Sequence, residues 1–309
     1  MQQDFFLDDF KINCGERALS CYQDQETLKQ NYKYELGKIF ERVESERLAE
    51  DFYSWQNLAN TRASHYKNRL YELEEDKALV AGIRFKGGDK NRPFVGIFCR
   101  NFKLDKSLQQ KLSTLFAKEF SVFKPATFRC YIPEEQKLEE LSYQTDLHLI
   151  AAPVRKLDFN HELPEGYKVE KASRLDFYEE FKKQYDRFIE SNQIGNELYP
   201  ATQSGLEECH RDGTLSVLLK EDEVQGVFAT SRESLEGLSG ISVFEEFLFE
   251  KSRGQGLAKV LQARSIKMLN YPKDEILMGT IHCENLASVR TAQNLGRKII
   301  GTYHFFNIL

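Results

Sequence analysis

The chain has 309 residues, about twice the length of a typical domain, so two domains are expected. Hydrophobic residues make up 41% and charged residues 29% of the sequence, which is too apolar for a disordered protein and too charged for a membrane protein. The net charge is −1 for residues 1–150 (23 basic, 24 acidic) and −4 for residues 151–309 (20 basic, 24 acidic). Neither half has the basic excess of a nucleic-acid-binding domain. We expect a soluble protein that binds neither nucleic acid nor a membrane.

Signals for export and for metal binding are weak. The acidic N-terminus lacks the positive start and the apolar stretch of a signal peptide. The six cysteines are scattered without a C-x-x-C pair, and the spacing of Cys14, Cys21 and His65 does not favour a zinc site. We therefore expect a cytoplasmic protein with reduced thiols and no bound metal.

The first half is predicted to start with helices and to continue as a sheet with helices. Apolar residues at steps of three and four predict a helix at 28–43, and a second helical stretch is expected at 46–75. The elements predicted next are strands at 78–85 and 94–99 joined by a turn at 86–89, a helix at 107–120, a strand at 127–132, a short helix opening at Pro133 and a strand at 146–154. This order predicts an N-terminal α+β domain at residues 1–154.

A linker at 155–166, flanked by Pro153 and containing Pro164, leads to a second series of elements. The expected elements are a strand at 167–170, a helix at 175–189, a loop at 192–201, a short helix near Leu206, strands at 215–219, 225–230 and 240–249, a helix from Leu257, a strand at 276–282, a helix from Asn285 and a strand at 298–308. They predict a second α+β domain at residues 165–309.

The turn before the helix from Leu257 has the composition of an anion-binding loop. Several backbone N–H groups at a helix start have no intrahelical partner and lie at the positive end of the helix dipole. Gly254 and Gly256 leave these groups open because they have no Cβ, and Arg253 adds a permanent charge that binds phosphate oxygens. The pattern predicts a pyrophosphate site; a plain strand–turn–helix with glycines for tight packing is the alternative.

The spacing Arg-x-x-Gly-x-Ala at Arg253, Gly256 and Ala258 resembles the pyrophosphate loop of the GNAT superfamily of acyl-CoA N-acyltransferases. A second segment, Asn285 to Gly296, is similar to the family's Asn-x-x-Ser/Ala helix that ends in Leu-Gly-Phe. Both segments keep the order and spacing of the family over residues 165–309.

The resemblance implies a mixed sheet splayed between its fourth and fifth strands, with acetyl-CoA bound in the splay. The acceptor is expected to be a primary amine of a small molecule or peptide, and a backbone N–H near Leu248 is expected to hold the developing oxyanion. The implied cofactor-binding residues are Phe247, Leu248 and Phe249 for the pantetheine, Arg253, Gly254, Gln255, Gly256, Leu257 and Ala258 for the pyrophosphate, and Asn285 near the thiol.

Two residues are candidates for the general base. Glu246 shares strand parity with Leu248 and is expected to face the cleft, with Glu245 on the other side. His282, at the end of the next strand, is the alternative, because an imidazole suits base work at neutral pH.

The candidate acid is Ser288. It stands three residues after Asn285, where a branch that includes ribosomal-protein Nα-acetyltransferases has a serine proposed as the thiolate acid. Many members instead have Tyr at the position of Ala292, and the family usually has Phe at the position of Arg297. Tyr303 is a weaker alternative acid.

The first half echoes the element order of the second, but its loop at 99–107 contains no glycine. It is predicted to be a degenerate GNAT-like domain without cofactor that walls the substrate cleft; an unrelated α+β domain is the alternative. The leading hypothesis is an acetyl-CoA-dependent N-acetyltransferase. The alternatives are a non-catalytic acyl-CoA sensor or interaction module and a tandem-domain aminoacyl transferase, against which the charge balance argues.

Overall fold

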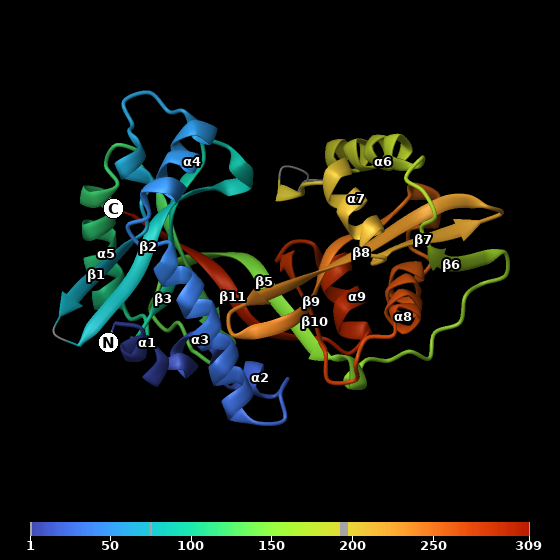
Figure 1. Cartoon of the computed structure of the whole chain (residues 1–309), viewed down its shortest axis with the longest axis horizontal. Helices are drawn as coiled ribbons and strands as arrows, with labels where there is room; N and C mark the ends of the chain where they lie inside the picture. The colour runs from blue at the N-terminus through green and yellow to red at the C-terminus, as the bar shows by residue number, and fades with distance from the viewer. Residues whose placement is uncertain (1, 75, 192–196, 309) are drawn as a thin grey trace. The chain divides into compact units, whose positions relative to one another are not determined.

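Two compact units make up the chain in the computed structural model, which describes residues 2–74, 76–191 and 197–308 (Figure 1). The first unit comprises residues 1–148, 234–238 and 300–309, and the second comprises residues 149–233 and 239–299. Each unit contains segments from both halves of the sequence. The units therefore do not correspond directly to the continuous domains predicted at 1–154 and 165–309, and those domain boundaries stay a prediction. Each unit combines helices with a sheet, which confirms the predicted α+β class.

The sheet of the first unit has the order β1-β2-β3-β4-β11-β5. β3 runs parallel to β4, whereas β1, β2 and β3 are successively antiparallel and β4 is antiparallel to β11. The elements of this unit are α1 (Gln2–Asp8), α2 (Phe10–Leu19), α3 (Gln25–Glu41), α4 (Glu46–Gln56), β1 (Arg69–Glu74), β2 (Lys77–Phe85), β3 (Pro93–Arg100), α5 (Lys106–Glu119), β4 (Thr127–Pro133), and parts of β5 (Tyr143–Pro153) and β11 (Lys298–Asn307).

The predicted hairpin at 78–85 and 94–99 is confirmed as β2 and β3, but two other expectations were wrong. The helix expected at 46–75 stops at Gln56, because Asn57 takes the left-handed conformation that ends a helix. Residues 69–74 pair with β2 as a strand, and the alternation of apolar and acidic residues from Tyr71 to Glu74 suits this strand. The short helix expected at Pro133 is absent, because β4 runs through Pro133 and the Glu134 N–H donates to Ile300 O at 3.0 Å.

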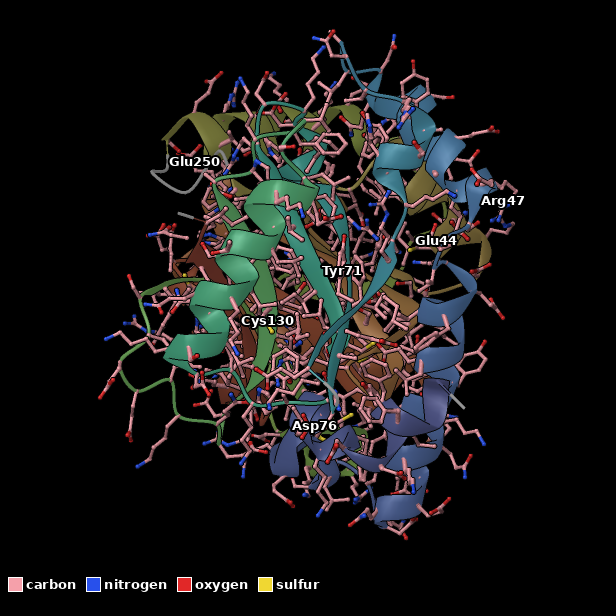
Figure 2. The ribbon with its side chains drawn as sticks, turned by 90° about the vertical axis from the view of Figure 1, so that its left-hand side faces the viewer. Glu44, Arg47, Tyr71, Asp76, Cys130 and Glu250 are labelled. Carbon is pink, nitrogen blue, oxygen red and sulfur yellow. The ribbon has the colours of Figure 1, made fainter. Side chains whose placement is uncertain are left out.

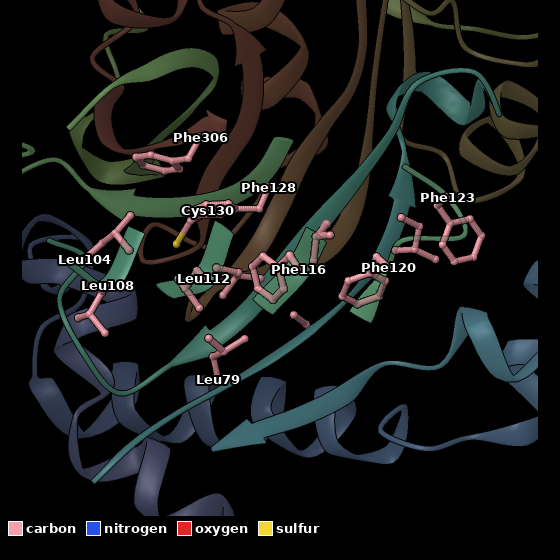
Figure 3. Packing of buried hydrophobic residues seen from close by; sticks show 14 of the residues in the cluster. Leu79, Leu104, Leu108, Leu112, Phe116, Phe120, Phe123, Phe128, Cys130 and Phe306 are labelled. Atoms are coloured by element: carbon pink, nitrogen blue, oxygen red, sulfur yellow. The ribbon is translucent and has the colours of Figure 1, made fainter. Parts of the chain in front are cut away.

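Aromatic side chains fill the core of the first unit. Phe116 of α5 packs edge-on against Phe128 of β4 with ring centroids 5.5 Å apart, and Phe128 stacks on Phe306 of β11 at 5.1 Å (Figure 3). Figure 2 shows Arg47 projecting away from α4, whereas Cys130 of β4 lies among the strands. Burial of these three rings is a main source of stability for this unit, since each buried aromatic ring contributes several kcal/mol.

The sheet of the second unit has the order β5-β10-β9-β8-β7-β6. The elements predicted from Tyr167 onward are confirmed within a few residues, although residues 192–196 of the predicted loop lie outside the described chain. The elements are β6 (Tyr167–Lys171), α6 (Tyr178–Ser191), α7 (Gln203–Arg211), β7 (Leu215–Lys220), β8 (Glu223–Leu235), β9 (Leu238–Leu248), α8 (Leu257–Leu269), β10 (Ile276–His282) and α9 (Leu286–Asn294).

Helices cover both faces of this second sheet (Figure 1). Val217 of β7 points toward α6 and α7, where it packs with Phe181 and Leu206. The next residue, Leu218, points to the opposite face and packs with Leu261 of α8. This alternation places α8 on one face and α6 on the other.

β9 and β10 separate along their length. They pair in parallel at Ile241–Leu277 and Ser242–Met278, yet β9 continues to Leu248 and β10 to His282. β9 and β10 are the fourth and fifth strands of the series that starts at β6. The splay expected between the fourth and fifth strands is therefore present.

Candidate active site

The turn from β9 to α8 leaves the start of α8 open. Gly254 and Gly256 have φ values of 74° and 72°, a region that favours glycine, and Gly256 is the residue that caps α8. No side chain caps the helix, and a Cβ built at either glycine meets no atom within 4 Å. The first N–H groups of α8 therefore face open space at the positive end of the helix dipole.

Arg253 brings a permanent positive charge to this turn. Its guanidinium lies 4.5 Å from the ring centroid of Phe188 and 4.8 Å from that of Phe247, and its Nε donates to Leu248 O at 2.8 Å. Its Nη2 is buried without a hydrogen-bond partner, and burial lowers the pKa of the side chain. A buried donor without an acceptor is costly, so an anion in the turn would satisfy it.

A cavity of about 440 Å³ opens between this turn, β9, α6 and α9, a volume within the range of small-molecule sites. It brings together ten of the thirteen site residues predicted from the sequence: Glu246, Phe247, Leu248, Arg253, Gly254, Gly256, Leu257, Ala258, Asn285 and Ser288. Lys259 also lines it and adds a second positive charge one helical turn after Gly256. Lys259 is not among the residues predicted from the sequence, although its place in the first turn of an anion-binding helix is a usable signal.

The carboxylate at the cavity is Glu246. Its side chain accepts a hydrogen bond from Gln262 Nε2, and its Oε1 is buried without a partner. Burial raises the pKa of Glu246 to about 7, against the opposing effects of the Arg297 charge and the Gln262 hydrogen bond. A carboxyl group with a pKa near neutral pH is suited to act as a general base.

Glu245 lies on the other side of β9, as strand parity predicts. Its Oε2 accepts from Ala201 N and its Oε1 from Glu246 N, each at 2.9 Å. Both carboxylate oxygens therefore bind backbone, and Glu245 holds the segment before α7 to the strand.

The start of α9 forms another wall of the cavity. Asn285 caps this helix, with Oδ1 accepting from Ser288 N at 3.2 Å. Ser288 is half-buried and lines the cavity. Ala292 is fully buried against Ile150 and Val289, so the position that carries Tyr in many GNAT members is part of the core here.

Three predicted residues do not line this cavity. His282 ends β10, where its Nδ1 accepts from Glu284 N at 3.4 Å. Phe249 is buried with the rings that pack under α6, and its N–H donates to Gln225 O at 2.8 Å. The Gln255 amide donates to Lys251 O at 2.7 Å, which folds this side chain back onto the turn.

The pantetheine contacts implied by the resemblance meet one obstacle. Leu248 O accepts from Arg253 Nε and Phe249 N already donates to Gln225. A ligand that pairs with the Leu248 carbonyl must share or displace the Arg253 bond.

The first unit repeats the strand–turn–helix arrangement with a closed helix start. β3 leads to α5, where the Asp105 carboxylate accepts from Leu108 N at 2.8 Å. Phe102 and Leu104 of the turn are buried in the core. A carboxylate cap satisfies a first-turn N–H and places a negative charge where an anion would bind.

Two further properties concern metals and membranes. Among the described residues, no group of three or more His, Cys, Asp or Glu side chains is arranged to hold a metal ion. No helix in the described part of the chain is both long and apolar enough to span a membrane.

Comparison with known proteins identifies the fold. No protein-family model and no curated protein matches the sequence. A GCN5-related N-acetyltransferase from Sphaerobacter thermophilus is 12% identical, with 82% of this chain and 84% of that chain covered and a TM-score of 0.53. A GCN5-related N-acetyltransferase from Kribbella flavida is 12% identical, with 86% of this chain and 96% of that chain covered and a TM-score of 0.48. A tandem GNAT protein from the clavulanic acid biosynthesis pathway is 10% identical, with 75% of this chain and 79% of that chain covered and a TM-score of 0.46.

At such identities the likeness shows the fold, and the Sphaerobacter structure carries the assignment. The splay between β9 and β10 and the open start of α8 agree with it. The chain has the fold of the GNAT superfamily of N-acetyltransferases, which confirms at the level of the fold the resemblance of the Arg253 and Asn285 segments.

Proposed function

We propose that the second unit is an acetyl-CoA-dependent N-acetyltransferase that acts on a primary amine of a small molecule or peptide. One observation carries the proposal: a single cavity contains the uncapped start of α8, the unpartnered Nη2 of Arg253 and the unpartnered Oε1 of Glu246. The first two features suit a pyrophosphate, and the third suits the transfer of a proton.

The residues that would hold the donor follow from this geometry. The N–H groups at the start of α8, with Arg253 and Lys259, would bind the pyrophosphate, and Asn285 and Ser288 would lie at the thiol end. Acetyl-CoA would supply an acetyl group activated as a thioester. By contrast, we propose that the first unit binds no CoA, because Asp105 caps the corresponding helix.

Glu246 is the proposed base. Its Oε1 takes a proton from the incoming ammonium, which frees the nitrogen lone pair to form the C–N bond as the C–S bond breaks. The second proton of the nitrogen passes to the sulfur, for which the Ser288 hydroxyl is the proposed carrier, and Glu246 returns its proton to solvent. The sum is one amide, one thiol and one released proton.

A non-catalytic acyl-CoA sensor is the second candidate. It is favoured by the residue at position 292, where many members of the family carry a tyrosine and this chain has an alanine buried in the core. Ser288 is then the proposed acid on α9. A sensor binds acetyl-CoA through the same α8 turn and transfers nothing.

The test is a calorimetric titration with acetyl-CoA, followed by an acetyl-transfer assay on a panel of small and peptidyl amines. We expect binding, and transfer that Glu246→Gln abolishes while binding is kept. No binding at millimolar acetyl-CoA contradicts both candidates. Binding without transfer to any amine contradicts the enzyme and favours the sensor.

A further inference from the structure

A buried chain of polar groups runs behind the proposed base. Gln262 of α8 is fully buried; its Nε2 donates to Glu246 Oε2, and its Oε1 accepts from Arg297 Nη2 at 2.8 Å. Arg297 precedes β11 and is 2% exposed. The sequence offered no role for this arginine beyond a departure from the family pattern.

The direction of the two hydrogen bonds, from Arg297 to Gln262 and from Gln262 to Glu246, has a physical cause. A guanidinium can only donate hydrogen bonds, so the Gln262 amide must turn its oxygen toward Arg297. The amide nitrogen then faces Glu246, whose Oε2 must accept. One carboxylate oxygen is thereby fixed, and Oε1 stays unpartnered at the cavity.

Glu246 and Arg297 both depend on the Gln262 amide that lies between them. Neither Glu246 nor Arg297 has an oppositely charged group within 4 Å among the described residues, so the pair interacts through Gln262 rather than in direct contact. Burying either charge without a partner is costly. The Gln262 amide thus links the two charges without a direct contact between them.

We propose that Arg297 is a positioning residue: acting through the Gln262 amide, it holds Glu246 as a hydrogen-bond acceptor with Oε1 directed to the cavity for the proton of the amine. The inference rests on the proposed function, in which Glu246 is the base. It explains the presence of a buried arginine that does not itself line the cavity.

The same arrangement sets the electrostatic surroundings of Glu246. The Arg297 charge and the amide hydrogen bond favour the ionised carboxylate, against burial. Among the described residues, the other charged or titratable groups near the carboxylate or around the cavity are Arg253 from the turn, Lys259 from α8 and Tyr185 from α6. Glu245 lies on the same strand, with its carboxylate on the other side.

The experiment reads the Glu246 carboxyl directly in the full chain labelled with ¹³C at the glutamate side-chain carbonyl. Its NMR signal is assigned by its absence in Glu246→Gln. Arg297→Met is expected to raise the midpoint of its titration by about one pH unit, because a favourable positive charge is lost. Arg297→Lys, which keeps the charge without the planar fork, is expected to give a smaller rise.

The matched control is Arg264→Met, on the same helix as Gln262. Arg264 is exposed and donates to His161 O at 3.1 Å, so its removal is expected to leave the midpoint in place. Gln262→Met removes both hydrogen bonds of the amide that links Arg297 to Glu246. It is also expected to raise the midpoint of the Glu246 titration, which keeps the test available if Arg297→Met does not fold. An unchanged midpoint in the folded variant overturns the proposal.

This readout needs no turnover and so separates the two claims. Amine-dependent release of CoA thiol is measured on the same samples. If Arg297→Met shifts the midpoint but the wild type transfers no acetyl group, the coupling of Arg297 to Glu246 is supported and the role of Glu246 as the base is contradicted. A shifted midpoint together with an equal shift in the acid limb of the pH–kcat/KM profile supports both.

Discussion

Replacing the proposed base is expected to make the protein more stable at high pH. In the folded chain, burial raises the pKa of Glu246 from 4.5 to about 7. When the pKa of a carboxyl is higher in the folded state than in the unfolded state, its contribution to stability is fully present at pH values below the pKa of the unfolded state. That contribution is lost as the pH rises through the pKa of the folded state. At 1.36 kcal/mol per pKa unit, ionising Glu246 costs the fold about 3 kcal/mol by pH 8.

Glu246→Gln removes this cost, because the amide never ionises. Urea unfolding of the variant and the wild type, followed by circular dichroism from pH 5 to pH 8, measures the difference in the free energy of unfolding. We expect that difference to grow in favour of the variant by about 2.5 kcal/mol across this range, because part of the cost is already present at pH 5. Glu250→Gln, at an exposed position in the turn after the same strand, is the control and is expected to show no such trend. A difference between Glu246→Gln and wild type that is equal at pH 5 and pH 8 refutes the reasoning.

Three further predictions concern the helix starts. Gly256→Ala and Gly166→Ala both place a Cβ at positive φ in open space and are each expected to cost about 1 kcal/mol of stability, but only Gly256→Ala should weaken acetyl-CoA binding in a calorimetric titration. Arg253→Met keeps the apolar stem against the rings and is expected to raise the Kd for acetyl-CoA about tenfold and to reduce its salt dependence; an unchanged Kd contradicts a phosphate contact. Asp105→Ala is expected to lower the unfolding free energy by about 1 kcal/mol through loss of the α5 cap, with the same calorimetric Kd as wild type.

Local patterns account for what the sequence predicts well. The start of α8 depends on a few consecutive residues, so Arg253 and Gly256 indicate an open helix start without knowledge of the rest of the fold. Strand parity likewise separates Glu246 from Glu245, because alternation along a strand needs no distant contact.

Contacts between distant segments explain what the sequence does not predict. Gln262 is 16 residues from Glu246 and 35 from Arg297, and the three meet only because α8 packs across the sheet. His282 suits base work by its chemistry, yet its ring binds the Glu284 N–H after β10 and does not line the cavity. The strand at 69–74, by contrast, could have been predicted, because apolar and acidic residues alternate from Tyr71 to Glu74.

We propose that acetyl transfer takes place in the cavity between β9 and α8, with Glu246 as the base. The most direct measurement is the release of free CoA thiol from acetyl-CoA by the full chain at pH 8, with and without each amine of a panel, for the wild type and Glu246→Gln. We predict thiol release that depends on the amine in the wild type and is lost in the variant. Equal release by the two proteins, or release that ignores the amine, would contradict the claim.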